Sequence, residues 1–235
     1  ETVVAKFYRP GRWSEAQILE EHAVAAELEQ AEVPAVGPLA IGGATLHRFE
    51  DFWFAVSPRR GGRTPELDDF EVLEWIGRFL ARIHSVGTAL PFAQRPALDL
   101  QSFGTASKDW LLAHHMVPLD VQAEWERVCT EALARVQASA LGQVGQAGGI
   151  ASLRLHGDCH ASNVLWIEEA DALKTDPMRT AGPHFVDFDD SRTGPAVQDL
   201  WMLLSGDRAS MQSQLASVLA GYEDFCEFDA RELYL

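Results

Sequence analysis

Residues 156–163 form the most informative stretch of the chain, His156-Gly157-Asp158-Cys159-His160-Ala161-Ser162-Asn163. A second acidic segment, Asp187-Phe188-Asp189, follows further along the chain. Both segments come directly after short apolar runs, residues 153–155 and 185–186, which the sequence predicts as strands. Side chains in this position lie at the rim of a sheet rather than inside it. The two segments therefore predict a functional site built from carboxylate and amide oxygens.

The residue types in these segments match the needs of phosphoryl transfer from ATP. This reaction requires a carboxylate near the acceptor hydroxyl, hard oxygen ligands for Mg²⁺ and a cation on the phosphates. Asp158 would act as the catalytic base, while Asn163 and Asp187 would bind the magnesium. Lys6 would supply the cation. An aspartate followed five positions later by an asparagine also has the spacing of a kinase catalytic loop.

Lys6 has a predicted partner in the first helix. Residues 2–8 read as a strand that contains Lys6, and the helix that follows places Glu21 within an apolar stripe. An unpaired carboxylate there would cost free energy, so a lysine on the adjacent strand is a suitable partner. Such a lysine–glutamate pair is a required part of a kinase nucleotide site. Glu20 falls on a more polar face and ranks second as the partner.

The order of predicted elements indicates an α+β protein with a bilobal, protein-kinase-like fold. Residues 1–58 contain strands and one helix, which Ser14 and Gln17 begin with a capping box, and predict a partial N-terminal lobe that binds nucleotide. Apolar residues then recur with a helical period, and residues 59–235 predict a mostly helical C-terminal lobe with the catalytic loop and metal-binding segment. Because the chain starts without methionine and directly on a strand, we expect a segment of a longer protein.

Composition excludes several classes of function. With 235 residues, 47% of them hydrophobic, the chain can bury a substantial core. Its formal net charge of −16 argues against a nucleic-acid or anionic-membrane partner. No apolar run approaches the roughly 20 residues that span a bilayer, and no signal peptide opens the sequence. Three scattered cysteines fit a reducing cytoplasm. The sequence leaves the oligomeric state open, and we expect a monomer.

The histidines of the 156–163 segment have two interpretations. His156 and His160 flank Cys159, which invites a zinc site. We expect instead that the histidines support the structure by fixing the backbone around Asp158.

Other polar and aromatic residues near these segments also have structural interpretations. Asp189 and Asp190 fit a solvated turn as well as they fit a functional site. We expect Trp166 and Trp201 to lie in the core rather than to stack on a ligand.

The pattern His-Gly-Asp-x-His-x-x-Asn at residues 156–163, followed by an aspartate after the next strand, resembles that of the aminoglycoside phosphotransferase and choline kinase group. Within this group the sequence is most similar to the stress response kinase A family of bacterial, cytoplasmic Ser/Thr protein kinases. The resemblance implies ATP and Mg²⁺ as cofactors. It covers most of the chain and is densest in residues 4–10, 54–56, 61–63, 153–166 and 185–201.

The resemblance also implies roles that spacing alone does not assign. Backbone near Val56 and Ser57 would form the hinge that meets adenine, and Asp199 would support the catalytic loop through hydrogen bonds. In the family a phosphate-covering loop precedes the strand lysine, and further helices continue the C-terminal lobe. The resemblance therefore implies an incomplete N-terminal lobe and a truncated C-terminal lobe, and this segment alone could be inactive.

Three functions follow from these observations. The resemblance alone favours an ATP- and Mg²⁺-dependent Ser/Thr protein kinase. However, Gly157 stands where eukaryotic-type protein kinases have an arginine, and only 12 positions separate Asp187 from Asp199, too few for a long activation segment. These features favour a small-molecule kinase that phosphorylates a hydroxyl of an amino alcohol or amino sugar. A nucleotide-binding, non-catalytic scaffold is the third alternative, and the presence of the complete motif argues against it.

Overall fold

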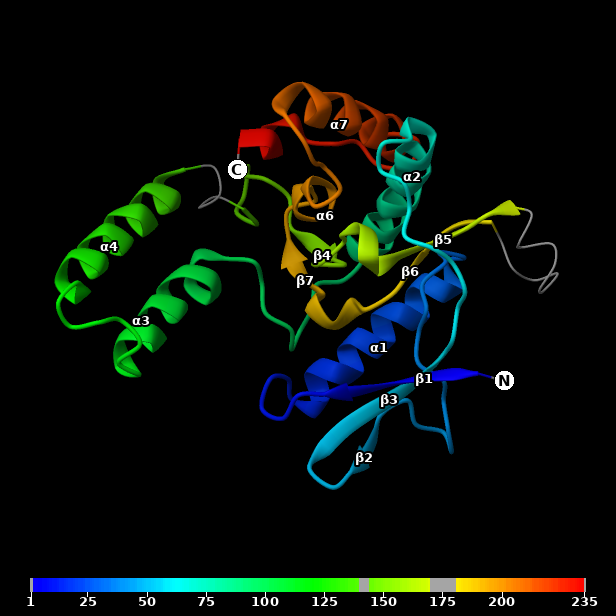
Figure 1. Cartoon of the computed structure of the whole chain (residues 1–235), viewed down its shortest axis with the longest axis horizontal. Helices are drawn as coiled ribbons and strands as arrows, with labels where there is room; N and C mark the ends of the chain where they lie inside the picture. The colour runs from blue at the N-terminus through cyan, green and yellow to red at the C-terminus, as the bar shows by residue number, and fades with distance from the viewer. Residues whose placement is uncertain (1, 140–143, 170–180, 235) are drawn as a thin grey trace.

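A three-stranded antiparallel sheet in the order β1-β3-β2, with one helix packed on it, forms the N-terminal lobe (Figure 1). The helix α1 (Glu15–Gln30) begins at Ser14 with the predicted capping box to Gln17. The computed structural model describes residues 2–139, 144–169 and 181–234. The strands of this sheet are β1 (Val3–Tyr8), β2 (His47–Phe49) and β3 (Phe52–Pro58).

The strand β3 is longer than its sequence indicates. A serine–proline pair is typical of a strand end, but Ser57 and Pro58 pair with Val4 and Val3 of β1. A proline at a strand end removes only one hydrogen-bond donor, so it does not prevent pairing there. The division between lobes at residue 58 therefore falls at the end of a strand, and it stays a prediction.

The larger, helical lobe is organised around the packed helices α2 and α7 (Figure 1). Two short, two-stranded antiparallel sheets lie beside these helices and carry the loops of the site. One pairs β4 with β7, and the other pairs β5 with β6. The helices are α2 (Phe70–Gly87), α3 (Ala106–Ala113), α4 (Gln122–Ala138), α6 (Val197–Trp201) and α7 (Arg208–Tyr222), with a π-helical turn η1 (Gln101–Thr105) before α3. The strands are β4 (Leu153–Leu155), β5 (Val164–Ile167), β6 (Gly182–Phe185) and β7 (Arg192–Gly194). Short 3₁₀ turns are η3 (Ala161–Asn163), η4 (Phe188–Asp190) and η5 (Ala230–Tyr234).

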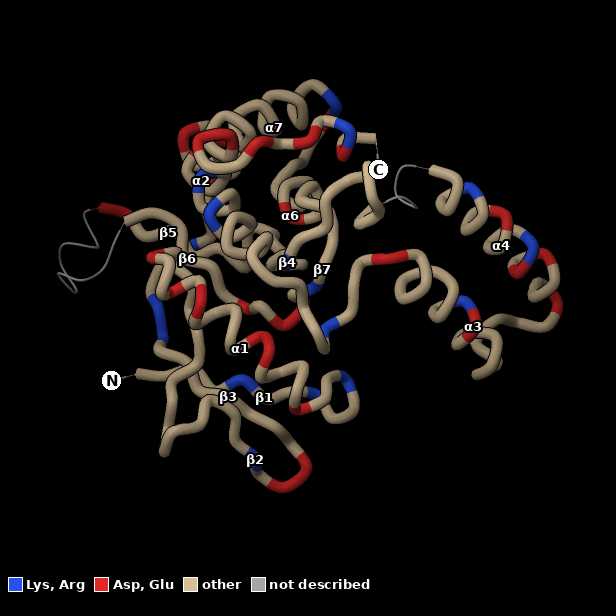
Figure 2. The backbone as a smooth tube through the Cα atoms, turned by 180° about the vertical axis from the view of Figure 1, so that it is seen from behind, with Lys and Arg blue, Asp and Glu red and all other residues tan. Residues whose placement is uncertain are grey.

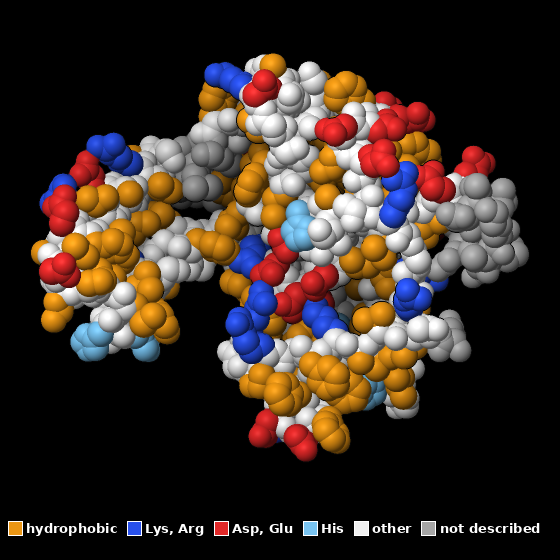
Figure 3. All heavy atoms as spheres, in the orientation of Figure 1, with side chains coloured by type: hydrophobic (Ala, Val, Ile, Leu, Met, Phe, Trp, Pro, Cys, Tyr) orange, Lys and Arg blue, Asp and Glu red, His pale blue; other side chains and the backbone are white. Residues whose placement is uncertain are grey.

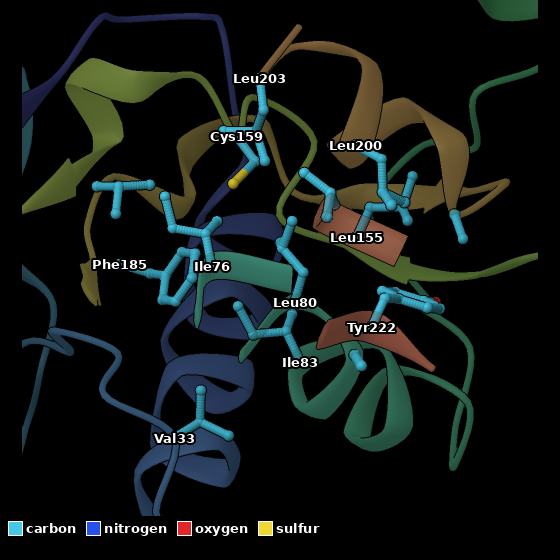
Figure 4. Packing of buried hydrophobic residues seen from close by; sticks show 14 of the residues in the cluster. Val33, Ile76, Leu80, Ile83, Leu155, Cys159, Phe185, Leu200, Leu203 and Tyr222 are labelled. Atoms are coloured by element: carbon cyan, nitrogen blue, oxygen red, sulfur yellow. The ribbon is translucent and has the colours of Figure 1, made fainter. Parts of the chain in front are cut away.

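The main hydrophobic core joins α2, α6 and α7 to the short strands (Figure 4). Leu73, Ile76, Leu80 and Ile83 of α2 are buried in this core, and Val72 and Phe79 pack partly buried against it, along the face that the helical period predicts. The N-terminal lobe has a separate, much smaller core between β1, β3 and α1. The sheets that carry the site are therefore held mainly by the helical lobe. Central residues are Leu80, Leu155, Phe185, Leu200 and Tyr222 in the main core, and Tyr8, Ile18, Leu46 and Ala55 in the small one.

The helices α3 and α4 form an arm that stands away from the rest of the lobe (Figures 1 and 2). Neither helix contains a buried residue. A cavity of about 630 Å³ lies between this arm and the body, and Phe103, Val136 and Trp201 are among its lining residues. Within the described residues, no helix is long and apolar enough to cross a membrane.

The prediction that Trp201 lies in the core is wrong. The short helix α6 buries Asp199 and Leu200 and leaves Trp201 on its exposed side. Trp201 is 54% exposed and lines the cavity. Trp166, by contrast, packs partly buried against the main core.

The contact between α2 and α7 depends on two glycines. A Cβ atom on Gly77 would overlap the carbonyl oxygen of Val218, and one on Gly221 would overlap the carbonyl oxygen of Glu74. The helix backbones therefore approach more closely than any side chain at these positions would permit.

We expect Gly77→Ala to lower the free energy of unfolding by about 1–3 kcal/mol, because the added methyl group must push α7 away from α2. Urea unfolding followed by circular dichroism measures this change. Ser213→Ala, on an exposed position of α7, is the control and should stay within about 0.5 kcal/mol. A Gly77→Ala protein as stable as the control would show that the helices do not need this close approach.

Candidate active site

Asp199 fixes the start of the loop that carries Asp158. Its Oδ2 accepts a hydrogen bond from the backbone N–H of His156 at 2.8 Å, and its Oδ1 accepts one from Gly157 at 2.8 Å. The ring Nε2 of His84 lies 3.0 Å from Oδ2. Burial alone would raise the pKa of Asp199, but the hydrogen bond and charge of His84 and the bonds from the loop hold it below its ordinary value. The buried carboxylate is therefore ionised, and each of its oxygens accepts a hydrogen bond from the backbone of the loop.

His84 is a part of the site that sequence reasoning missed. It lies on α2, fully buried, with Nδ1 2.8 Å from the hydroxyl of Tyr222 on α7. It thereby connects the helix pair to Asp199. The available sequence signal was a histidine on the apolar face of a helix, which is ambiguous by itself.

His156 connects the catalytic loop to the segment that leads to Asp187. Its buried ring lies with Nε2 2.9 Å from the carbonyl oxygen of Val186, to which it must donate. The other nitrogen, Nδ1, then accepts from the N–H of Asp158 at 3.4 Å. Burial lowers the pKa of His156, which favours this neutral form. The ring therefore acts as a fixed spacer between the two loops.

Gly157 adopts a conformation that only glycine fits well. Its φ is +86°, and a Cβ atom there would overlap the carbonyl oxygen of Asp190. The loop of Asp158 and the turn after Asp187 therefore pack backbone against backbone. This contact leaves no room for the arginine that eukaryotic-type kinases have at the position.

Asp158 and Asn163 lie next to each other within the loop. The Nδ2 of Asn163 donates to the carbonyl oxygen of Asp158 at 2.9 Å and to its Oδ2 at 3.2 Å. His160 is more exposed, with Nε2 3.5 Å from the same Oδ2. The amide nitrogen of Asn163 therefore sets the orientation of the Asp158 carboxylate.

Lys6 joins the two lobes at this site. Its Nζ lies 2.8 Å from Oδ1 of Asp187, 3.3 Å from Oε1 of Glu21 and 3.4 Å from Oδ1 of Asp189. Burial would lower the pKa of Lys6, but Glu21 and Asp187 raise it above its ordinary value. Lys6 is therefore cationic, and it contacts both the predicted helix partner and the predicted metal ligand.

Asp187 and Glu21 respond differently to these surroundings. Asp187 has a left-handed backbone (φ +61°), half-exposes its carboxylate, and has a pKa that Lys6 lowers against the opposing effect of burial. Burial raises the pKa of Glu21, although Lys6 and Arg95 oppose the increase. Asp187 therefore presents an ionised, accessible carboxylate. The carboxylate of Glu21 is buried, and its ionised form depends on the charges of Lys6 and Arg95.

A cavity of about 60 Å³ lies beside Lys6 in this site. Ser57 lines it together with Lys6 and Glu21, whereas Val56 does not, and the carbonyl oxygen of Val56 accepts the N–H of Leu39 at 2.7 Å. This volume is far below the roughly 300–1,000 Å³ of ligand pockets, so the cavity by itself does not accommodate a nucleotide. Of the two predicted hinge residues, Ser57 lines this cavity and Val56 does not, and their contact with adenine stays a prediction.

The turn after Asp187 is charged and paired rather than solvated. Nη1 of Arg12 lies 3.0 Å from Asp189, and its Nη2 lies 2.8 Å from Asp190, which also pairs with Arg192 at 2.7 Å. Figure 3 shows acidic and basic side chains gathered where the N-terminal lobe meets the helical lobe. Arg12 is thus a second residue of the N-terminal lobe that reaches this turn, and no sequence motif marks it.

Comparison with known proteins identifies the architecture. The family model described as "Phosphotransferase enzyme family" matches residues 1–234. The chain belongs to this family. Stress response kinase A of Escherichia coli (strain K12) is 41% identical over 232 residues, which cover 99% of this chain and 65% of that protein. "Serine/threonine protein kinase RdoA" of Salmonella typhimurium (strain LT2) is 40% identical over the same shares of the two chains. This phosphotransferase-family chain therefore spans 65% of the length of these curated relatives.

Solved structures of two kinases share the fold. Amicoumacin kinase hAmiN, in complex with AMP-PNP, Ca²⁺ and Ami, has a TM-score of 0.72 at 15% identity, over 97% of this chain and 67% of its own. A microcompartment-associated aminopropanol kinase has a TM-score of 0.65 at 18% identity, over 98% and 71%. The predicted α+β, kinase-like bilobal fold and the resemblance to stress response kinase A are confirmed.

Cys159, between the predicted catalytic residues of this phosphotransferase-family chain, is sealed in the core. It is 0% exposed, and burial raises the pKa of its thiol well above the ordinary value (Figure 4). A protonated, inaccessible thiol is inert, so Cys159 serves packing.

We expect Asp199→Asn to lower the free energy of unfolding by about 2–4 kcal/mol at neutral pH, because the amide nitrogen would face N–H groups that have lost their acceptor. The folded pKa of Asp199 lies below its ordinary 3.8, so the contribution is complete above that pH and is lost as the pH falls through the folded value. The difference between the two proteins should therefore be largest at pH 5–7 and shrink below about 3.8.

Urea unfolding across this pH range provides the measurement, with Asp51→Asn at a 92% exposed side chain as the control. A loss for Asp199→Asn that is equally large at all pH values would contradict the ionised, hydrogen-bonded carboxylate.

Proposed function

We propose that the protein is a Ser/Thr protein kinase, similar to stress response kinase A, which transfers the γ-phosphoryl group of ATP to a protein hydroxyl with Mg²⁺ as cofactor. The observation that carries the proposal is the Lys6–Asp187 ion pair at the junction of the lobes, beside the loop of Asp158, which packs against the turn after Asp187. The curated relatives named as kinases align over 99% of the chain.

Lys6 and Glu21 would bind the nucleotide. Lys6 is cationic and its Nζ lies 2.8 Å from Oδ1 of Asp187, so the phosphate oxygens of a bound nucleotide would compete for it. Glu21 would keep the lysine directed at the phosphates, since its Oε1 lies 3.3 Å from Nζ. Ser57 at the cavity would lie on the side of the base.

The oxygen atoms available to a metal fit Mg²⁺. Asp187 offers an ionised, half-exposed carboxylate, and Asn163 offers its amide oxygen because Asp158 takes up the amide nitrogen. Magnesium characteristically takes one or two protein oxygens and completes its shell with water and substrate phosphates. When bound, Mg²⁺ would neutralise developing charge on the phosphates.

The chain's own residues would then carry the transfer. Asp158 would orient the acceptor hydroxyl and take its proton, while the hydroxyl oxygen bonds to the γ-phosphorus and the bond to the leaving oxygen of ADP breaks. Asn163 would hold the Asp158 carboxylate through its Nδ2. His156 and Asp199 would keep the loop at a fixed distance from Asp187.

A small-molecule acceptor is the second candidate. Gly157 cannot be replaced by the arginine that would bind a phosphorylated activation segment, because Asp190 packs against it. The structural neighbours with known acceptors in their names, amicoumacin kinase and aminopropanol kinase, act on small molecules. A hydroxyl of an amino alcohol or amino sugar would then replace the protein side chain.

We expect Asp158→Ala to lower turnover by about 10²-fold or more while leaving the affinity for Mg²⁺–AMP-PNP nearly unchanged, because the carboxylate acts on the acceptor. Asp187→Ala should weaken that affinity as well, because it removes a metal ligand. Isothermal titration and ATP consumption provide the two readouts, with Asp51→Ala as the exposed control. Equal, small effects of both substitutions would contradict the assigned roles.

The acceptor class is tested with γ-labelled ATP and Mg²⁺, with the protein alone and with a generic basic protein. Stress response kinase A of E. coli is the reference and Asp158→Ala the blank. We expect label on Ser or Thr of protein, absent in the blank. ATP consumption only upon addition of amino alcohols or amino sugars, without labelled protein, would replace the protein kinase by the small-molecule kinase.

A further inference from the structure

Arg95 is a fully buried arginine at the centre of the site, outside every motif of the sequence. Its side chain is 0% exposed, and its guanidinium stacks on Trp13 with 4.3 Å between Cζ and the ring centroid. Nε donates to the carbonyl oxygen of Ser191 at 2.6 Å, Nη1 donates to that of Gln17 at 3.0 Å, and Nη2 donates to that of Asp189. One side chain thus binds the backbone of α1 and two carbonyl oxygens of the turn after Asp187.

The second oxygen of Glu21 faces this arginine. Nη1 of Arg95 lies 3.6 Å from Oε2, for which the described residues provide no hydrogen bond. Oε1 contacts Lys6 instead. The carboxylate that would orient Lys6 is therefore held between two cations, and Arg95 is the more deeply buried of them.

The backbone of Arg95 is also anchored on α1. The carboxylate of Glu20 accepts the N–H groups of Ala93, Gln94 and Arg95 at 2.6, 3.0 and 2.8 Å. Glu20 therefore holds the loop that carries Arg95, and it is not the partner of Lys6. Because α1 fixes both the backbone and the side chain of Arg95, a displacement of the helix must move the arginine with it.

We propose that Arg95 is a positioning residue that locks α1 to the turn after Asp187, so that Glu21 and Asp187 keep their places around Lys6. The consequence for nucleotide binding rests on the proposed function. The guanidinium suits this role because its planar fork can reach three carbonyl oxygens in fixed directions, which an ammonium group cannot.

The mechanical part of the proposal is tested by hydrogen–deuterium exchange on Arg95→Met and Arg95→Lys. We expect faster exchange in residues 187–193 and in the first turns of α1 for both variants. Arg82→Met is the matched control, because Arg82 donates to the carbonyl oxygens of Ala31 and Glu32 at the other end of α1. It should affect only that end. Unchanged exchange at residues 187–193 in Arg95→Met would overturn the proposal, whatever the protein binds.

The functional part is tested by the affinity for Mg²⁺–AMP-PNP. We expect it to weaken by about 10- to 100-fold in Arg95→Met, less in Arg95→Lys, and not in Arg82→Met. Wild-type affinity in a folded Arg95→Met protein would overturn the positioning role. If the wild-type protein itself does not bind the nucleotide, the proposed function fails, and the exchange experiment alone decides the role of Arg95.

The pH dependence of this affinity separates positioning from general destabilisation. Glu21 is faced by Lys6 and Tyr8 from β1, by Arg95, and by Asp189 from η4. Removing the Arg95 charge raises the pKa of Glu21 further, so Arg95→Met should lose affinity at a higher pH than wild type as the solution is acidified. Arg95→Lys should stay nearer the wild-type midpoint. An unmoved midpoint in Arg95→Met would contradict the proposal.

Discussion

The carboxylate of Asp199 accepts hydrogen bonds from the backbone of His156 and Gly157 and from the ring of His84, and the geometry of the site depends on these contacts. Because the group is buried and charged, any other arrangement would leave a charge without partners in the core. The loop is therefore set by the helical lobe before a ligand enters. His156 then passes this constraint to Val186 and to the segment of Asp187.

The second constraint is charge balance across the lobes. The chain carries a net charge of −16, yet Lys6, Arg12 and Arg95 all converge on the turn of residues 187–191. These contacts come from the N-terminal sheet, from the loop before α1 and from the loop after α2. The N-terminal lobe is attached by Val24 and Leu28 of α1, which pack in the main core, and, at the site, by these ion pairs and buried hydrogen bonds. Such contacts respond directly to a charged ligand.

Local patterns in the sequence predicted the elements whose periodicity is strong and the residues whose chemistry is conspicuous. Glu21 was found because a carboxylate in an apolar stripe needs a cation, and the spacing of Asp158 and Asn163 marked their loop. Arg95 could not be found in this way, because its partners lie up to 96 positions away and are mostly backbone carbonyls. Trp201 was misplaced because its hydrophobicity does not reveal which side of a five-residue helix is covered.

The most direct test of the account is a crystal structure of the protein with Mg²⁺ and AMP-PNP. The account predicts the metal at about 2.0–2.1 Å from the Asn163 amide oxygen and an Asp187 carboxylate oxygen. It also predicts Lys6 on the phosphates and Glu21 still between Lys6 and Arg95. A nucleotide bound away from the lobe junction, or a metal held by other residues, would contradict it.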